Sequence, residues 1–297
     1  MKRSVGHLGR LLLGLVFLAA GLLKAIDPVE FARQVAAYGL IGPGTAALAA
    51  PLLIALEITL GVALIAGAWP RVVAVAAAGL LLGFISVEAY GLSVGRTKSC
   101  GCFGALVERT PAQVIVEDLV FIGFGLLAIW GLAGWVGMRA GRALKTVAVT
   151  AIAAVTLAAV SPALPIDHWV TALKIGAVVA DLPVASHLQD AGDGRTLVAL
   201  LDVADPGAAG TAGTLNDLAA LPGAPRLLAL TASDDEAVAA FQWTAVPAFE
   251  VRRVDPPVLK RLYRRLPRFF LVEGGRVRAV YDDAAPKPAE LIGTEGS

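Results

Sequence analysis

Both cysteines of the chain, Cys100 and Cys102, lie in the stretch KSCGCFG (98–104), between two strongly apolar segments. Thiol–disulfide exchange needs an attacking thiolate, an accessible sulfur and a second sulfur that closes the cycle. Gly101 permits the unusual backbone angles that a bridge between residues two apart requires. The strain of so small a ring makes a disulfide more reducible and more oxidising. The stretch therefore predicts a redox-active cysteine pair.

The basic residues beside the pair agree with this chemistry. Arg96 and Lys98 are close enough in sequence to favour the thiolate form. A bridge that serves only stability is less favoured, because the entropy gained by closing a loop grows with loop length. Two alternatives stay open: the cysteines pack unpaired at a helix end, or they form half of a metal site shared with a partner.

A metal site within this chain is not predicted. Zinc sites use four protein ligands, or three where the metal is catalytic. The three histidines, His7, His168 and His187, all lie far from the cysteines in sequence.

The composition indicates a membrane protein. Of the 297 residues, 57% are hydrophobic and 16% are charged, whereas soluble domains average roughly 25% charged residues. The net charge of +1 gives no reason to expect nucleic acid as a partner. Long apolar runs dominate before about residue 161, and soluble-type composition begins after about 176. We expect a four-helix membrane domain over 1–140, a fifth helix and linker over 141–175, and a soluble domain over 176–297.

Five segments are long and apolar enough to cross a bilayer, which takes about 20 residues in a helix. They are roughly 8–26, 46–68, 71–94, 114–136 and 143–161. Lys and Arg near the ends of the segments weakly favour a cytoplasmic N-terminus. Five spans then place the cysteine stretch and the C-terminal half outside. In a bacterial inner membrane both would face the periplasm, where disulfides form and persist.

Several acidic residues interrupt these segments. Glu57 lies near the centre of its apolar run, and charges inside a membrane are costly and often functional. Two interpretations stay open for Glu57: a proton relay or partner for Lys24, and a structural ion pair or hydrogen bond that fixes helix packing. Glu88, Glu117 and Asp118 lie nearer helix ends, where a structural role is favoured.

Three stretches together carry a family resemblance. They are GLLKAIDPVEFARQVAAYGLIGP (21–43), PLLIALEITLGVALIAG (51–67) and SCGCFG (99–104). In this order they resemble the MauE branch of the DoxX-like membrane proteins, named for a methylamine-utilisation protein. The resemblance covers about residues 5–136. It implies a four-helix membrane fold associated with periplasmic thiol–disulfide chemistry, with Cys100 and Cys102 as the reactive residues and Lys24 and Glu57 as supporting ones.

The soluble part alternates predicted strands and helices. Strands are expected at 196–203, 226–232 and 247–254, and helices at 211–221 and 233–243, with Ser233 as the N-cap. A basic helix is expected over 256–266, with Lys260, Arg261, Arg264 and Arg265 on a solvated face rather than in a charged patch for a partner. Two further strands within 267–283 are joined by Glu-Gly-Gly, which is typical of a hairpin. This order predicts an α/β fold.

The order of these elements resembles the thioredoxin fold, especially its membrane-anchored periplasmic versions. The resemblance implies a cis proline before the hairpin, at Pro267, beside a groove that binds extended peptides. The family's Cys-x-x-Cys pair follows the first central strand, and the matching stretch DVADPGAAGTAG (202–213) contains no cysteine. This domain is therefore not expected to exchange disulfides itself.

These observations predict an inner-membrane protein that passes disulfide equivalents through Cys100 and Cys102 during maturation of periplasmic redox proteins. It would act as a thiol–disulfide oxidoreductase with a periplasmic client or partner protein. Membrane quinone is a reasonable electron acceptor because it shares the lipid phase, although no residue pattern indicates a quinone site. The alternative is a non-catalytic subunit or assembly factor of a membrane complex, with the thioredoxin-like domain as its docking module.

Overall fold

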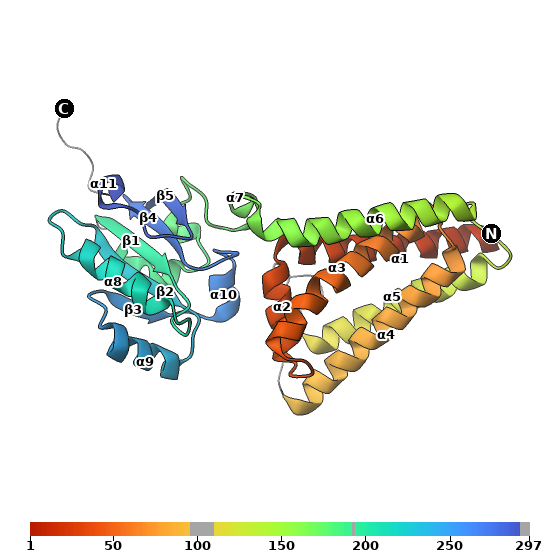
Figure 1. Cartoon of the computed structure of the whole chain (residues 1–297), viewed down its shortest axis with the longest axis horizontal. Coiled ribbons are helices and arrows are strands. Elements are labelled where there is room, and N and C mark those ends of the chain that lie inside the picture. The colour runs from red at the N-terminus through yellow and green to blue at the C-terminus, as the bar shows by residue number, and fades with distance from the viewer. Residues whose placement is uncertain (96–109, 192–193, 292–297) are drawn as a thin grey trace. The chain divides into compact units, whose positions relative to one another are not determined.

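A computed structural model describes residues 1–95, 110–191 and 194–291. The chain forms two compact units, Met1–Leu164 and Pro165–Ser297 (Figure 1). Four predicted site residues lie outside the described residues: Lys98, Cys100, Gly101 and Cys102.

The first unit is helical. Its helices are α1 (Lys2–Ile26), α2 (Pro28–Ala37), α3 (Pro43–Ala66), α4 (Pro70–Val94), α5 (Pro111–Gly131) and α6 (Ala140–Val160), with a short 3-10 turn, η1, at Ser161–Ala163. In the described part of the chain, five of these helices are long and apolar enough to cross a membrane: α1, α3, α4, α5 and α6. The predicted spans are confirmed. A proline occupies the first helical position of α2 to α5, where its missing N–H has no intrahelical partner to lose.

Helix α1 is at the centre of the packing and runs antiparallel to α3 and α5. It contacts both helices, while α4 packs on α5, and α2 and α6 pack on α3 (Figure 1). The α1–α3 approach depends on glycine. A Cβ added at Gly61 would lie 2.6 Å from the backbone nitrogen of Leu18, and one at Gly21 would lie 3.0 Å from the nitrogen of Ile58. Small residues of this kind allow membrane helices to approach closely.

A buried arginine joins α1 to the end of α3. The Nη1 group of Arg10 donates to the carbonyl oxygens of Leu64 and, at 2.9 Å, Ile65. These carbonyls are in the last turn of α3, where four oxygens lack intrahelical donors. The guanidinium carbon also lies 5.4 Å from the ring centroid of Trp135. Arg10 therefore contributes a specific contact between α1 and α3 as well as a charge.

The second unit is an α/β fold, as predicted. Its strands are β1 (Arg195–Leu200), β2 (Arg226–Thr231), β3 (Glu250–Arg253), β4 (Arg268–Glu273) and β5 (Arg276–Asp282), in the order β3-β2-β1-β4-β5. β1, β2 and β3 are parallel, and β4 pairs antiparallel with β1 and β5. Burial of β1 on both faces explains its continuous apolar sequence.

Two hydrophobic clusters cover the two faces of this sheet. One face packs against α8 (Ala208–Ala219), α9 (Asp235–Ala245) and α11 (Pro288–Leu291). The other packs against α10 (Pro256–Lys260) and a segment over 173–188. That segment contains the 3-10 turns η2 (Val179–Asp181) and η3 (Ala185–His187). The unit also contains α7 (Asp167–Val170) and a further 3-10 turn, η4 (Gln189–Ala191).

The end of β1 lies beside Pro267. The Leu266–Pro267 peptide bond is cis, as the thioredoxin resemblance implies. Arg268 is paired with Leu200, the last residue of β1. This register places Pro267 next to the start of the cysteine-free stretch 202–213.

Two local predictions are wrong. Asp234, rather than Ser233, is the N-cap of α9, and its carboxylate accepts from the Ala237 N–H at 2.9 Å. The predicted basic helix ends at Lys260, not 266. Its later arginines were expected on a solvated face, but Arg264 is buried and pairs with Asp167 at 3.2 Å. A tertiary partner for this charge outweighs the local helical pattern.

Replacement of Gly61 by alanine tests the α1–α3 approach. The new Cβ would meet the Leu18 backbone, so we expect Gly61→Ala to lose about 1–3 kcal/mol of stability through overpacking. Gly79→Ala in α4, with open space at its Cβ position, is the matched control and should be neutral or slightly stabilising. Unfolding in a detergent titration measures both variants. Equal stability of the two would contradict the close approach.

Arg252 links the 3-10 segment 185–191 to the sheet edge. It donates to the His187 carbonyl oxygen and to Asp190 Oδ2, both at 2.6 Å, and to Glu250. These hydrogen bonds hold the pKa of Asp190 and of Glu250 below the usual carboxyl values.

The lowered carboxyl pKa values give Arg252 a pH-dependent role. Their stabilising contribution is complete above the ordinary carboxyl range, at about pH 5, and is lost as the pH falls through the lowered values. We therefore expect Arg252→Met to reduce thermal stability at pH 7, with a deficit that shrinks in acid. The more exposed Arg278→Met is the control. A deficit independent of pH would refute this account.

Candidate functional site

A buried ion pair joins α1 to α3. The Nζ group of Lys24 donates to Oε1 of Glu57, and both side chains are only 2% exposed. The ammonium also lies 5.1 Å from the ring centroids of Phe31 in α2 and Phe84 in α4. The sequence left two interpretations open for Glu57, and pairing with Lys24 is observed. A pair in so apolar a setting persists only when its geometry is well satisfied.

The local sequence explains the position of Lys24. Pro28 cannot continue α1, so α1 ends at Ile26 and leaves Lys24 in its last turn. Cations are favoured there because the last carbonyls of a helix carry partial negative charge. Asp27 caps α2 by accepting from the Glu30 N–H at 3.0 Å. The chain therefore turns directly after Lys24, and α2 brings Phe31 over the ammonium.

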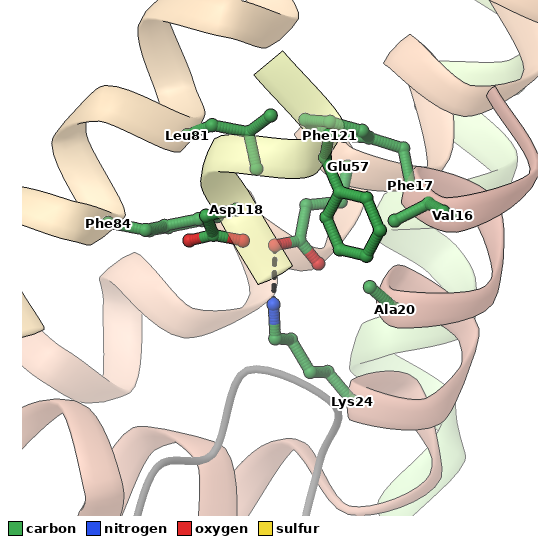
Figure 2. Close-up of a pocket in the computed structure, with 9 residues that line it drawn as sticks. All are labelled: Val16, Phe17, Ala20, Lys24, Glu57, Leu81, Phe84, Asp118 and Phe121. Atoms are coloured by element: carbon green, nitrogen blue, oxygen red, sulfur yellow. Dashed lines mark hydrogen bonds and ion pairs between the residues drawn. The ribbon is translucent and has the colours of Figure 1, made fainter. Parts of the chain in front are cut away.

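A second carboxyl group faces this pair. Asp118 in α5 is 5% exposed and lines the same small cavity, of about 20 Å³, as Lys24 and Glu57. Figure 2 shows the carboxyl groups of Glu57 and Asp118 pointing toward each other above the lysine nitrogen. Within the described residues, Oε2 of Glu57 and Oδ2 of Asp118 have no hydrogen-bond partner. Asp118 therefore lies beside the Lys24–Glu57 pair, and the structural role expected for it stays a prediction.

A third carboxyl group lies close by, on α4. Glu88 is 2% exposed and accepts a hydrogen bond from the hydroxyl of Tyr38, the residue that ends α2. Glu88 and Tyr38 line a second cavity, of about 210 Å³, which Lys24 and Phe84 also line. Lys24 and Phe84 therefore border both cavities. We call Lys24, Tyr38, Glu57, Glu88 and Asp118 the polar cluster.

The polar cluster lies toward one end of the helical unit. Lys24 is in the last turn of α1, while Glu88 and Asp118 are within about two turns of the end of α4 and the start of α5. Because α1 and α4 both run antiparallel to α5, these helix termini share one end. The chain leaves α4 and returns to α5 at this same end. The segment that carries Cys100 and Cys102 is therefore attached next to the polar cluster.

Three carboxyl groups of the polar cluster lie in an apolar interior, and Glu57 pairs with the Lys24 ammonium. Burying an isolated carboxylate costs far more than burying its neutral acid. The arrangement is chemically suited to hold protons.

Sequence reasoning did not place Tyr38 or Asp118 beside the Lys24–Glu57 pair. Tyr38 lies inside the quoted stretch 21–43, but nothing marks one tyrosine in an amphipathic segment as a partner for a glutamate fifty residues later. Spacing contained a signal for Asp118. Asp118 and Phe121 are three residues apart on α5, as Leu81 and Phe84 are on α4, and all four face the cavity.

The second unit presents a polar turn where thioredoxins carry cysteines. Asp202 Oδ1 accepts from the Ala204 N–H and from the Ser233 hydroxyl, both at 3.1 Å. Pro267 is half-buried beside this turn, and its carbonyl oxygen accepts from the Asp283 N–H at 3.2 Å. A peptide groove at Pro267 remains a prediction.

The Lys24–Glu57 pair can be tested by a double-mutant cycle. Lys24→Met leaves an uncompensated buried carboxylate, so we expect a loss of about 3–5 kcal/mol. The double variant Lys24→Met/Glu57→Leu removes both charges and should recover much of that loss. Lys145→Met, at an exposed lysine on α6, is the control. Unfolding in mixed detergent micelles measures the wild type, the single variant Glu57→Leu and these three variants. Additive losses in the double variant would contradict direct coupling.

Comparisons with known proteins agree with the helical architecture. Residues 2–131 match the sequence model of the family described as methylamine utilisation protein MauE. Protein TlpB of Flavobacterium psychrophilum is 30% identical over 122 residues, which is 38% of this chain and 33% of that relative. The chain thus spans about a third of the length of this relative. No solved structure matches the chain. Residues 2–131, in the N-terminal helical part of this membrane protein, thus resemble the MauE family.

Proposed function

We propose that this protein supports thiol–disulfide exchange at the periplasmic face of a bacterial inner membrane, through Cys100 and Cys102. A disulfide between them would accept two electrons from a client dithiol. The client would leave with a new disulfide, and the pair would become two thiols. The observation that carries the proposal is the position of the cysteine segment between α4 and α5, at the end of the helices that contains the polar cluster.

The proposed orientation has a cytoplasmic N-terminus. With five spans, the segment between α4 and α5 and the whole second unit then lie outside. Cytoplasmic Lys and Arg near the first span agree with the positive-inside rule. An oxidising compartment would allow the cysteine pair to persist as a disulfide.

Within this proposal the polar cluster has a chemical task. Thiol oxidation releases protons, and thiolate formation requires their removal. Carboxyl groups that share one ammonium can take up and release protons beside the reacting segment. Lys24 and Glu57 would then both fix the helices and hold a proton-exchanging site.

The second unit would bind rather than react. Its stretch 202–213 has no cysteine, so it cannot exchange disulfides. A groove beside Pro267 would instead dock a client or a partner protein near the membrane. The same observation favours a second candidate function, a non-catalytic subunit or assembly factor in which the cysteines form at most a fixed bridge.

Redox titration of the cysteine pair separates these two functions. Thiols would be trapped in membranes with a mass-tagging maleimide across a series of redox buffers. We expect reversible titration at a potential more oxidising than about −300 mV, the value below which structural bridges lie. The Cys100→Ser and Cys102→Ser variants define the single-tag signal. A pair locked in one state, or tagged only after denaturation, would leave the subunit function as the better account.

A further inference from the structure

We propose that a cavity on α6 binds the head group of an anionic phospholipid, with Arg142 and Lys145 as the residues that contact its phosphate. The cavity has a volume of about 390 Å³, and small-molecule sites in proteins are typically about 300–1,000 Å³. It is lined by Met138, Arg142, Lys145, Thr146, Val149 and Thr150. The proposal does not depend on the chemistry of the cysteines.

Both cations of the cavity are available to a ligand. Arg142 and Lys145 are exposed, and neither side chain forms a hydrogen bond or an ion pair with another residue that the structure describes. They are three residues apart on α6 and therefore lie on the same face of the helix. A guanidinium can donate two parallel hydrogen bonds to a phosphate, and an ammonium adds a compact positive charge.

The cavity lies at the end of the helical unit where α1, α4 and α6 begin. The Met138 N–H, just before α6, donates to the carbonyl oxygen of Gly67, just before α4, at 3.0 Å. At the start of α1, a Cβ added at Gly6 would lie 2.7 Å from the carbonyl carbon of Gly131, the last residue of α5. This end is therefore the one opposite to the polar cluster.

The sequence gives this end positive charge without acidic neighbours. The stretches that reach it, 1–23, 58–87 and 119–166, contain no Asp or Glu. Their basic residues are Lys2, Arg3, Arg10, Arg71, Arg139, Arg142 and Lys145. Arg10 is already bound to the carbonyl oxygens of α3. Counter-charges for the others must come from outside these stretches, and for a helix that crosses a membrane anionic lipid head groups are a dense source of them.

The cations also lie at a depth that suits a lipid phosphate. Helix α6 has 21 residues, so at 1.5 Å per residue it spans about 30 Å, which is the thickness of the hydrocarbon core. Arg142 and Lys145 are within its first two turns. Long basic side chains near the end of a span extend toward the head groups. A phosphate at the boundary between lipid and water is therefore within their reach.

The same face of α6 continues as a surface for an acyl chain. Val149 and Ile152, four and seven residues after Lys145, are 58% and 68% exposed. The hydroxyl of Thr146 lies between the cations and this apolar surface, and it donates to the sulfur of Met138 at 3.8 Å. A thioether is a weak acceptor, so a phosphate or ester oxygen of a lipid would be a better one.

This combination favours a lipid over a free anion. An inorganic phosphate would contact the cations but would leave the apolar surface beside them uncovered. Basic residues at the ends of spans also set membrane orientation, but that role depends on charge and not on a cavity. Arg3 and Arg71 are exposed at the same end and do not line this cavity. They therefore serve to separate specific binding from general attraction.

Lipid binding to the full chain tests the proposal. The protein, purified in a neutral detergent, would be titrated with dioleoyl phosphatidylglycerol and followed by native mass spectrometry, with dioleoyl phosphatidylcholine as the reference lipid. We expect Arg142→Gln/Lys145→Gln to bind phosphatidylglycerol at least about tenfold more weakly, equivalent to about 1.4 kcal/mol. The matched control Arg3→Gln/Arg71→Gln removes the same charge from the same end and should change the affinity less than about twofold.

Two further measurements separate the sources of phosphate and keep the test decisive if a variant folds poorly. Inorganic phosphate at millimolar concentration should not displace the lipid. In the unchanged chain, a photoactivatable phosphatidylglycerol should crosslink to the peptide 138–152. Equal losses in the two double variants, equal binding of the two lipids, displacement by inorganic phosphate, or crosslinks confined to other peptides would each overturn the proposal.

Discussion

The ion pair between Lys24 and Glu57 is the constraint on which the helical unit depends. Two charges in an apolar interior must meet with good geometry, so the rotation and register of α1 against α3 are fixed together. The glycines at this crossing make the required approach possible, since a Cβ at Gly21 would crowd Ile58 and Glu57. Phe31 and Phe84 flank the same ammonium and draw α2 and α4 to it. Lys24 on α1 thereby contacts side chains from three other helices, α2, α3 and α4.

The same pair concentrates chemistry at one end of the unit. Asp118 and Glu88 add carboxyl groups near the Lys24 ammonium, and two cavities meet at Lys24. The second unit contains no sulfur. Any thiol chemistry in this chain must therefore belong to the helical part. The match to the MauE family, over residues 2–131, lies in this same part.

Much of this architecture was predictable, because apolar length and strand–helix alternation are local signals. The spans and the order of the α/β elements follow from them. The position of Pro267 before the hairpin follows from the resemblance of that order to the thioredoxin fold. Pairings between distant residues were less accessible. Tyr38 and Glu88, or Arg10 and Leu64, meet only after the helices pack. Arg264 is not on a solvated helix face, because it forms a buried ion pair with Asp167, almost a hundred residues earlier in the chain. The cysteine pair, the strongest sequence signal, lies outside the described residues.

Arg10 and Lys24 both lie on α1, about 21 Å apart at 1.5 Å per residue. Each holds α3, Arg10 at the carbonyls of its last turn and Lys24 at Glu57. Two fixed points on one pair of antiparallel helices prevent sliding and pivoting between them. The α1–α3 pair therefore forms a rigid part of the helical unit, in which the two helices keep a fixed position relative to each other. Any gating that admits a ligand or a proton to the polar cluster falls to α2, α4 and α5, which contribute the remaining walls of its cavities.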